Sequence, residues 1–442
     1  MLDKSLIAAQ PQTTVGNATF IEGGLGAVRG IRCSGISAGF RRNPQRKDFA
    51  LIVTESPAVS AAVFTQNLFC AAPVSLSRNH LLQEAMSDVD KPDSTKGVRA
   101  IALNSGNANA TTGEPGMQIA IRTAQITAQH LGCQPHQVLV ASTGVIGVPL
   151  GEDPFVKGIP LALEQLGPAD GTALDSGLHA AQAIMTTDTY PKQAAAHVAI
   201  TQEDGTEVVY TIAGMVKGSG MIQPNMATLL GVFATDAWLT QKAADNALRQ
   251  VMDVTLNKVT IDSDTSTNDS VFFLATGATK GATITEGSPQ FEAFVSAFRV
   301  LSEDLTRQIA YDGEGATRLV TVNVSGAVDD ENADKIGRSV ANSPLVKTAI
   351  AGHDANWGRI AMAIGKSGAT FRQENVSITF MGMQVCEQGL PVAFDEGEAL
   401  RRFDENIEII IDIVVGEGKG QARLWTCDFT HDYIRINGDY RT

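Results

Sequence analysis

Thr228 stands in a segment whose residue types suit nucleophilic chemistry at a threonine hydroxyl. The segment, residues 217–235, reads KGSGMIQPNMATLLGVFAT and places Thr228 at the start of an apolar, strand-like run. A threonine hydroxyl is a weak nucleophile without a neighbouring base, but an N-terminal threonine can use its own α-amine. Thr228 gains such an amine only if its bond to Ala227 is cut. From these residues alone, a β-branched residue that begins a strand is the simpler interpretation.

Other catalytic motifs do not fit the sequence. GEGATR and GEGKGQAR do not match the phosphate-binding P-loop, and no G-x-G-x-x-G opens a helix after a strand. The seven histidines lie far apart and H-E-x-x-H does not occur, so we expect no metal site. GSG at 218–220 does not fit the G-x-S-x-G motif of hydrolases. We interpret His353 as a structural hydrogen-bonding residue.

The composition is that of a folded, acidic protein. The 442 residues are 43% hydrophobic and carry a net charge of −14, which argues against general disorder and against nucleic-acid or anionic-membrane partners. The five cysteines form no C-x-x-C pair, so neither a disulfide framework nor a zinc site is expected. No stretch approaches the roughly 18 apolar residues that a membrane span needs. We therefore expect a cytoplasmic protein with small-molecule partners.

Helical and strand-like patterns alternate, which predicts an α/β (α+β) fold of helices layered on sheets. Strand-like runs occupy 48–55, 98–104, 137–142, 194–200, 207–216, 227–235, 271–277, 318–326, 407–416 and 421–429. Helical spacing of apolar residues occupies 115–132, 172–185, 240–257, 289–310 and 331–342. We expect the last two strands to be joined by the glycine turn EGKG, and the polar segment 86–97 to be a linker.

Several blocks resemble the ornithine acetyltransferase family, also called bifunctional glutamate N-acetyltransferase/amino-acid acetyltransferase. Besides KGSGMIQPNMATLL they are LNSGNANA (103–110), ASTGVIG (141–147), IMTTDTYPK (184–192), DGEGATR (312–318), GHDANWGR (352–359) and YIRINGDYRT (433–442). The blocks occur in family order, from about residue 14 to the last residue. One departure is Ala355, where members commonly have proline; it loosens that turn without touching a reactive group.

The resemblance implies a self-cleaving enzyme of arginine biosynthesis, with the layered helix-on-sheet sandwich of the ornithine acetyltransferase and self-cleaving aminopeptidase type. Cleavage between Ala227 and Thr228 would give an α-chain, 1–227, and a β-chain, 228–442, that both contribute to the active site. They would associate as a heterotetramer of two α and two β chains. Thr228 would carry the acetyl group of N2-acetylornithine as an ester before glutamate takes it, in a ping-pong reaction.

The resemblance also assigns roles to residues. Thr143 and Gly144 would stabilise the oxyanion, and the substrate-binding residues would be Thr186, Lys217, Thr228, Glu314, Asn437 and Thr442. Thr187 and Thr189 are chemically equivalent to Thr186, so the substrate contact among these threonines stays open. Asn104 and the asparagines of 107–109 could line the site, but such amide-rich loops are also common for backbone reasons.

Alternatives remain at this point. A self-processing aminopeptidase or amidase of the same fold would use water as the acceptor in place of glutamate. A non-catalytic binding protein would be indicated by loss of Thr228, Thr143 or Glu314, and all three are present. No cofactor is expected, although acetyl-CoA could be a second acetyl donor. The location would be mitochondrial if the source is fungal.

Overall fold

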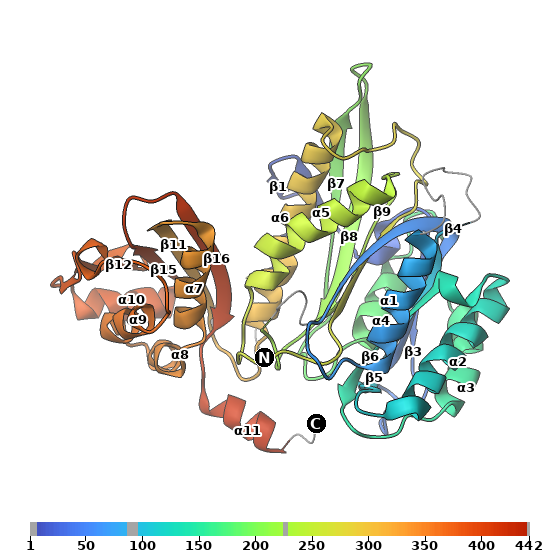
Figure 1. Ribbon diagram of the computed structural model, residues 1–442, viewed down its shortest axis with the longest axis horizontal. Helices are drawn as coiled ribbons and strands as arrows, with labels where there is room; N and C mark the ends of the chain where they lie inside the picture. The colour runs from blue at the N-terminus through green and yellow to red at the C-terminus, as the bar shows by residue number, and fades with distance from the viewer. Residues whose placement is uncertain (1–6, 86–95, 224–228, 440–442) are drawn as a thin grey trace.

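A computed structural model describes residues 7–85, 96–223 and 229–439, and it contains two sheets with helices packed on them (Figure 1). The larger sheet has ten strands within the described residues, in the order β1-β2-β7-β8-β9-β10-β4-β5-β6, and β3 also pairs with β4. Its strands are β1 (Thr14–Val15), β2 (Ala18–Ile21), β3 (Ile31–Ile36), β4 (Phe49–Phe64), β5 (Val98–Asn107), β6 (Val138–Val145), β7 (Lys192–Thr201), β8 (Glu207–Lys217), β9 (Leu230–Thr235) and β10 (Ser270–Ala275).

Helices cover both faces of the larger sheet. They are α1 (Ala72–Ala85), α2 (Gly113–Leu131), α3 (Asp153–Glu164), α4 (Leu174–Ala183), α5 (Gln241–Val254) and α6 (Pro289–Tyr311). Alternate residues of β10 face opposite sides, as strand geometry requires: Phe273 packs in the core under α5 and α6, whereas Phe272 packs in the core under α4. The result is a helix–sheet–helix sandwich (Figure 1).

The second sheet has six strands in the described part of the chain, in the order β14-β13-β12-β15-β11-β16. Its strands are β11 (Leu319–Ala327), β12 (Ser377–Phe380), β13 (Met383–Glu387), β14 (Leu390–Pro391), β15 (Glu408–Val414) and β16 (Gly420–Cys427). The accompanying helices are α7 (Asp330–Ala341), α8 (Pro344–Ala351), α9 (Trp357–Gly365) and α10 (Glu396–Glu405). The final helix, α11 (His431–Asp439), extends from this unit (Figure 1).

The mixed α/β prediction is confirmed, and the last two strands are joined by the EGKG turn as expected. The strands around the EGKG turn do not pair with each other, because β11 lies between them, parallel to β15 and antiparallel to β16. The helices α1, α3 and α8 to α11 were not predicted from the sequence. Most of the predicted linker, residues 86–95, lies outside the described residues.

Helix α6 carries the chain from the sandwich to the predicted site. Its first turn is fixed by Ser288, whose hydroxyl accepts a hydrogen bond from the Phe291 N–H at 3.1 Å, and Pro289 occupies the first helical position. Its last residue, Tyr311, is buried, and the loop that follows holds Asp312 and Glu314. A long buried helix thus places two carboxylates at one end of the larger sheet.

Candidate active site

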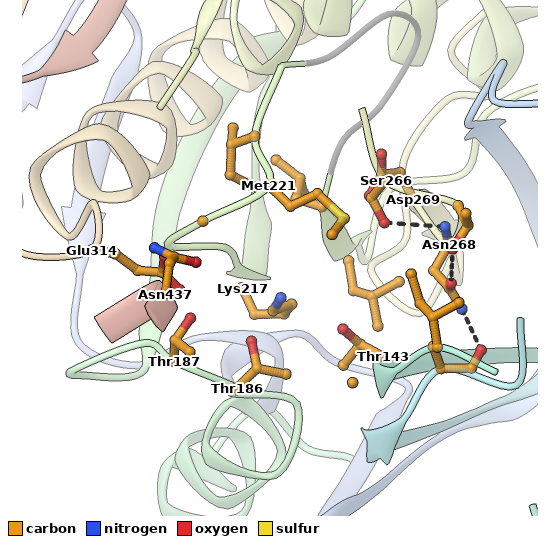
Figure 2. A pocket seen from close by; sticks show the side chains of 18 residues that line it. Thr143, Thr186, Thr187, Lys217, Met221, Ser266, Asn268, Asp269, Glu314 and Asn437 are labelled. Carbon is orange, nitrogen blue, oxygen red and sulfur yellow. Dashed lines mark hydrogen bonds between the residues drawn. The ribbon is translucent and has the colours of Figure 1, made fainter. Parts of the chain in front are cut away.

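One pocket is lined by the predicted residues Thr143, Gly144, Thr186, Lys217, Glu314 and Asn437 (Figure 2). They come from the end of β6, the loop before β7, the end of β8, the loop after α6, and α11. The predicted residues Ala227, Thr228 and Thr442 lie outside the described residues. Ile222 and Leu229, which stand on either side of residues 224–228, also line the pocket.

The end of β6 is shaped by close contact with β5. Gly144 has φ 132°, and a Cβ atom there would lie 2.4 Å from the carbonyl carbon of Gly106. Only glycine fits this conformation and this approach. The pairing with β5 shifts register at this point. The backbone irregularity therefore sets Thr143, whose side chain points into the pocket, and the Gly144 peptide at the pocket wall (Figure 2).

A buried ion network lies beneath the loop that carries Thr186. The Lys192 ammonium contacts Asp188 Oδ1 at 2.7 Å and Asp312 Oδ2 at 2.5 Å, and its side chain is fully buried. Burial opposes ionisation of Asp188, but Lys192 and Lys217 outweigh it and hold its pKa below the ordinary range. Asp188 also accepts hydrogen bonds from the backbone N–H of Thr186 at 2.9 Å and of Gly218 at 2.8 Å. One carboxylate therefore fixes two walls of the pocket.

Lys217 ends β8 with its side chain in the pocket, between Thr143 and the Glu314–Asn437 pair in Figure 2. It is buried, and its amine makes no hydrogen bond to another described residue. Burial lowers its pKa from the ordinary lysine value, although Asp188 and Asp269 partly oppose this. A buried cation without a hydrogen-bonding partner is suited to a substrate carboxylate.

Glu314 is held by backbone and by α11. Its N–H donates to the Ser219 carbonyl at 2.8 Å, and its Oε2 accepts a hydrogen bond from the Asn437 side-chain amide at 2.7 Å. Gly220 permits this arrangement because a Cβ atom there would lie 2.4 Å from the same carboxylate oxygen. The close approach of the 218–220 backbone to Glu314 explains a glycine that the sequence motif alone did not.

The loop 266–269, which was not predicted from the sequence, forms another wall of the pocket (Figure 2). The Asn268 amide donates to the carbonyls of Ala108 at 2.5 Å and Ser142 at 2.9 Å. Burial raises the Asp269 pKa well above its ordinary value, and its Oδ2 has no hydrogen-bonding partner among the described residues. The run STND directly before a buried strand is the signal that could have indicated this wall.

Some of the threonines and asparagines considered as substrate contacts line the pocket, and others do not. Thr186 and Thr187 line the pocket, whereas the Thr189 hydroxyl donates to the Asp312 carboxylate instead. The asparagine side chains in LNSGNANA form hydrogen bonds with the backbone. Asn104 donates to the Asn107 carbonyl at 2.9 Å, and Asn109 donates to the Gly116 carbonyl at 2.9 Å. Of that block, Ala108 lines the pocket.

His353 lies outside the pocket lining, stacked on Phe403 with ring centroids 5.2 Å apart and within 3.2 Å of the Arg318 guanidinium. It is thus a structural residue, as expected. The described residues contain no group of three or more His, Cys, Asp or Glu side chains that could hold a metal ion. No helix in the described ranges is long and apolar enough to cross a membrane.

Fold and pocket together describe a mixed α/β protein whose pocket combines hydroxyl groups, a glycine peptide at positive φ and a buried lysine, groups that suit acyl transfer to a small anionic molecule. A sequence profile described as the ArgJ family matches residues 32–442. The chain belongs to the ArgJ family.

Similar proteins are named as proteins of arginine biosynthesis. The bifunctional protein ArgJ of Symbiobacterium thermophilum is 44% identical over 96% of this chain and 100% of its own length. The mitochondrial bifunctional protein ArgJ of Chaetomium globosum is 41% identical over 93% of this chain and 88% of its own length. The solved ornithine acetyltransferase of Mycobacterium tuberculosis, complexed with ornithine, is 34% identical over 48% of this chain and 100% of the solved chain, with a TM-score of 0.39.

The predicted family is therefore confirmed, and so is the predicted class of enzyme, an acyltransferase of arginine biosynthesis. The roles of individual site residues stay predictions.

Proposed function

We propose that the chain transfers an acetyl group from N2-acetylornithine to glutamate through an acetyl ester on Thr228. The observation that carries this proposal is the convergence of Thr143, Lys217 and Glu314 on one pocket that Leu229 also lines. These residues belong to sequence blocks that lie far apart in the chain. Their meeting at one place supports a shared catalytic role.

The nucleophile would be generated by self-cleavage. The Thr228 hydroxyl attacks the Ala227 carbonyl carbon, the C–N bond between these residues breaks, and the hydroxyl proton goes to the freed amine. Water then hydrolyses the ester, which leaves an Ala227 carboxylate and restores the hydroxyl. The products, 1–227 and 228–442, would remain together because β8 and β9 are adjacent antiparallel strands, with Lys217 opposite Leu230.

In the transfer itself, the Thr228 hydroxyl bonds to the acetyl carbon and ornithine leaves as the amide C–N bond breaks. The α-amine of Thr228 takes the hydroxyl proton and returns it to the departing amine. Glutamate's amine next attacks the ester, giving N-acetylglutamate and the free hydroxyl. The Thr143 hydroxyl and the Gly144 N–H would stabilise the oxyanion in both steps.

The remaining pocket residues would orient the substrates. Lys217 supplies a buried positive charge for the α-carboxylate that both substrates share. Glu314, fixed by Asn437, would bind the ornithine amine or orient the Thr228 amine. Thr186, and Thr442 in the tail, would complete substrate binding.

We further propose that no cofactor is needed and that acetyl-CoA is a second acetyl donor, in keeping with the word bifunctional in the names of the relatives. The assembly would be a heterotetramer of two α and two β chains. A bacterial source would place the enzyme in the cytoplasm and a fungal source in mitochondria, as the name of the Chaetomium relative states for that protein.

Intact mass and N-terminal sequencing of the purified protein test the proposal. We expect fragments 1–227 and 228–442 in the wild type, with Thr at the second N-terminus. Thr228→Ala lacks the attacking hydroxyl and should stay full length and inactive. A wild type that is uncut and fully active would refute the proposed nucleophile.

A further inference from the structure

A carboxylate outside the pocket lining, Asp262, holds the chain shortly before the predicted cleavage site. Its Oδ2 accepts a hydrogen bond from the Met221 N–H at 2.6 Å, and its Oδ1 accepts one from the Ile222 N–H at 2.8 Å. Two successive backbone N–H groups thus converge on one anion, the arrangement known as a nest. Asp262 itself is half-buried in the loop after Ile261.

The contact matters because Met221 has an unfavourable backbone conformation. Its φ is 53°, in the left-handed region that residues with a Cβ atom rarely adopt. Such a conformation persists when surrounding contacts over-determine it, and it is common at functional sites. The two hydrogen bonds to Asp262 supply that constraint.

Neighbouring contacts fix the residues that follow. The Ile261 N–H donates to the Ile222 carbonyl at 2.7 Å, and the Thr265 hydroxyl donates to the Gln223 carbonyl at 2.9 Å. Residues 221–223 are therefore bound to the loop 261–265 without belonging to a helix or strand. The path of the chain up to residue 223 depends on this loop.

Asp262 also receives a contact from the tail helix. The Tyr433 hydroxyl donates to Asp262 Oδ2 at 3.2 Å, and the same helix, α11, carries Asn437, which binds Glu314. One carboxylate therefore joins the chain before the cleavage site to the helix that borders the substrate pocket.

We propose that Asp262 is a positioning residue for self-cleavage, which holds the left-handed turn at Met221 and so sets the path of the chain through residue 223, shortly before the Ala227–Thr228 bond. This inference rests on the proposed function. Asp262 acts through the backbone and takes no part in the bond changes themselves.

Asp262→Asn tests this role with Asp264→Asn as the matched control. Asparagine offers one acceptor oxygen where aspartate offers two, so one of the nest contacts is lost. The exposed Asp264 carboxylate accepts no hydrogen bond from the described residues and lies in the same loop. Conversion of newly synthesised full-length chain to fragments is followed by intact mass, with thermal unfolding measured alongside. We expect D262N to slow cleavage by at least roughly tenfold, because small misplacements of reacting groups are costly, and D264N to cleave at the wild-type rate.

The double variant D262N/M221G separates local positioning from general damage. Glycine adopts a positive φ without the Cβ penalty, so it should restore part of the cleavage rate even if D262N also loses stability. Cleavage of D262N at the wild-type rate overturns the proposal, and so does a slow D262N that M221G does not accelerate. An uncut, active wild type would contradict the self-cleavage itself and is recognised before any variant is compared.

Discussion

The side-chain amide of Asn437 donates a hydrogen bond to Glu314 Oε2 at 2.7 Å, although the two residues lie 123 positions apart in the sequence. The contact brings the tail helix α11 against the loop that follows α6. Asn437 also donates to the Tyr433 carbonyl in its own helix at 3.0 Å. The tail helix α11 therefore forms part of the pocket wall and orients the Glu314 carboxylate.

Removal of this contact should weaken substrate binding. A hydrogen bond to a charged group contributes about 1.5–3 kcal/mol, so Asn437→Ala should raise the KM for N2-acetylornithine by roughly tenfold or more. Arg435→Ala is the control, because its ion pair with Asp432 on the same helix is exposed. Steady-state kinetics measure both, and equal KM values for N437A and wild type would show that Glu314 needs no support from α11.

Thr143→Ala should act on the chemical step. Loss of one oxyanion donor lowers kcat by on the order of 10²-fold, with little change in KM because the donor acts in the transition state. Thr143→Ser keeps a hydroxyl and should recover most of the rate. An unchanged kcat in T143A would mean that Thr143 serves only to pack the end of β6.

We expect the KM for both substrates to depend on pH through the protonation of Lys217. Burial lowers its pKa below the ordinary value of 10.5, and only the protonated amine attracts a carboxylate. Affinity is therefore complete below the lowered pKa and is lost as the pH rises through it. The KM for both substrates should increase at alkaline pH, before an ordinary lysine would titrate. Lys217→Arg stays charged in this range and also controls for titration of the substrate amines, so a parallel rise in K217R would exclude Lys217 as the cause.

We expect replacement of Lys192 to lower the free energy of unfolding strongly. Lys192→Met would leave Asp188 and Asp312 buried without their cation, and such a loss typically costs about 3–5 kcal/mol. The exposed pair between Lys335 and Glu331 provides the control, since Lys335→Met should change the free energy of unfolding by about 1 kcal/mol or less. Urea unfolding measures both. A K192M protein as stable as the wild type would show that the carboxylates are neutral or hydrated.

Local patterns in the sequence predicted individual helices and strands well, but they did not predict which distant strands pair. The helix at 289–310 and the strand at 271–277 were found because their apolar spacing is strong, and both match α6 and β10 closely. The short helices α8 and α9 were not predicted, because eight or nine residues give little periodicity. The turn that joins the strands 407–416 and 421–429 was predicted, but their local pattern gave no sign that β11, from earlier in the chain, lies between them in the sheet.

The same limit applied to the site, where residues in recognisable sequence blocks were predicted and residues that act through distant contacts were not. Thr143, Lys217 and Glu314 could be selected because each stands in a recognisable block of sequence. Asn268 could be noticed only as part of the polar run STND before a strand, and Asp262 could not be selected at all. Their importance lies in backbone groups that they reach across the fold: Asn268 binds the Ala108 carbonyl, and Asp262 binds the Met221 N–H. No local pattern of residues indicates such partners.

In the proposed mechanism, Thr228 carries the acetyl group between donor and acceptor. Incubation with N2-acetylornithine without glutamate, followed by mass spectrometry of the peptide that begins at Thr228, tests it most directly. We expect one added acetyl group on that peptide, its loss on addition of glutamate with formation of N-acetylglutamate, and only slow release of acetate without glutamate, because a closed pocket disfavours water. Absence of acetyl from this peptide during active turnover would contradict the covalent mechanism. Acetate released as fast without glutamate as N-acetylglutamate is formed with it would identify a hydrolase instead.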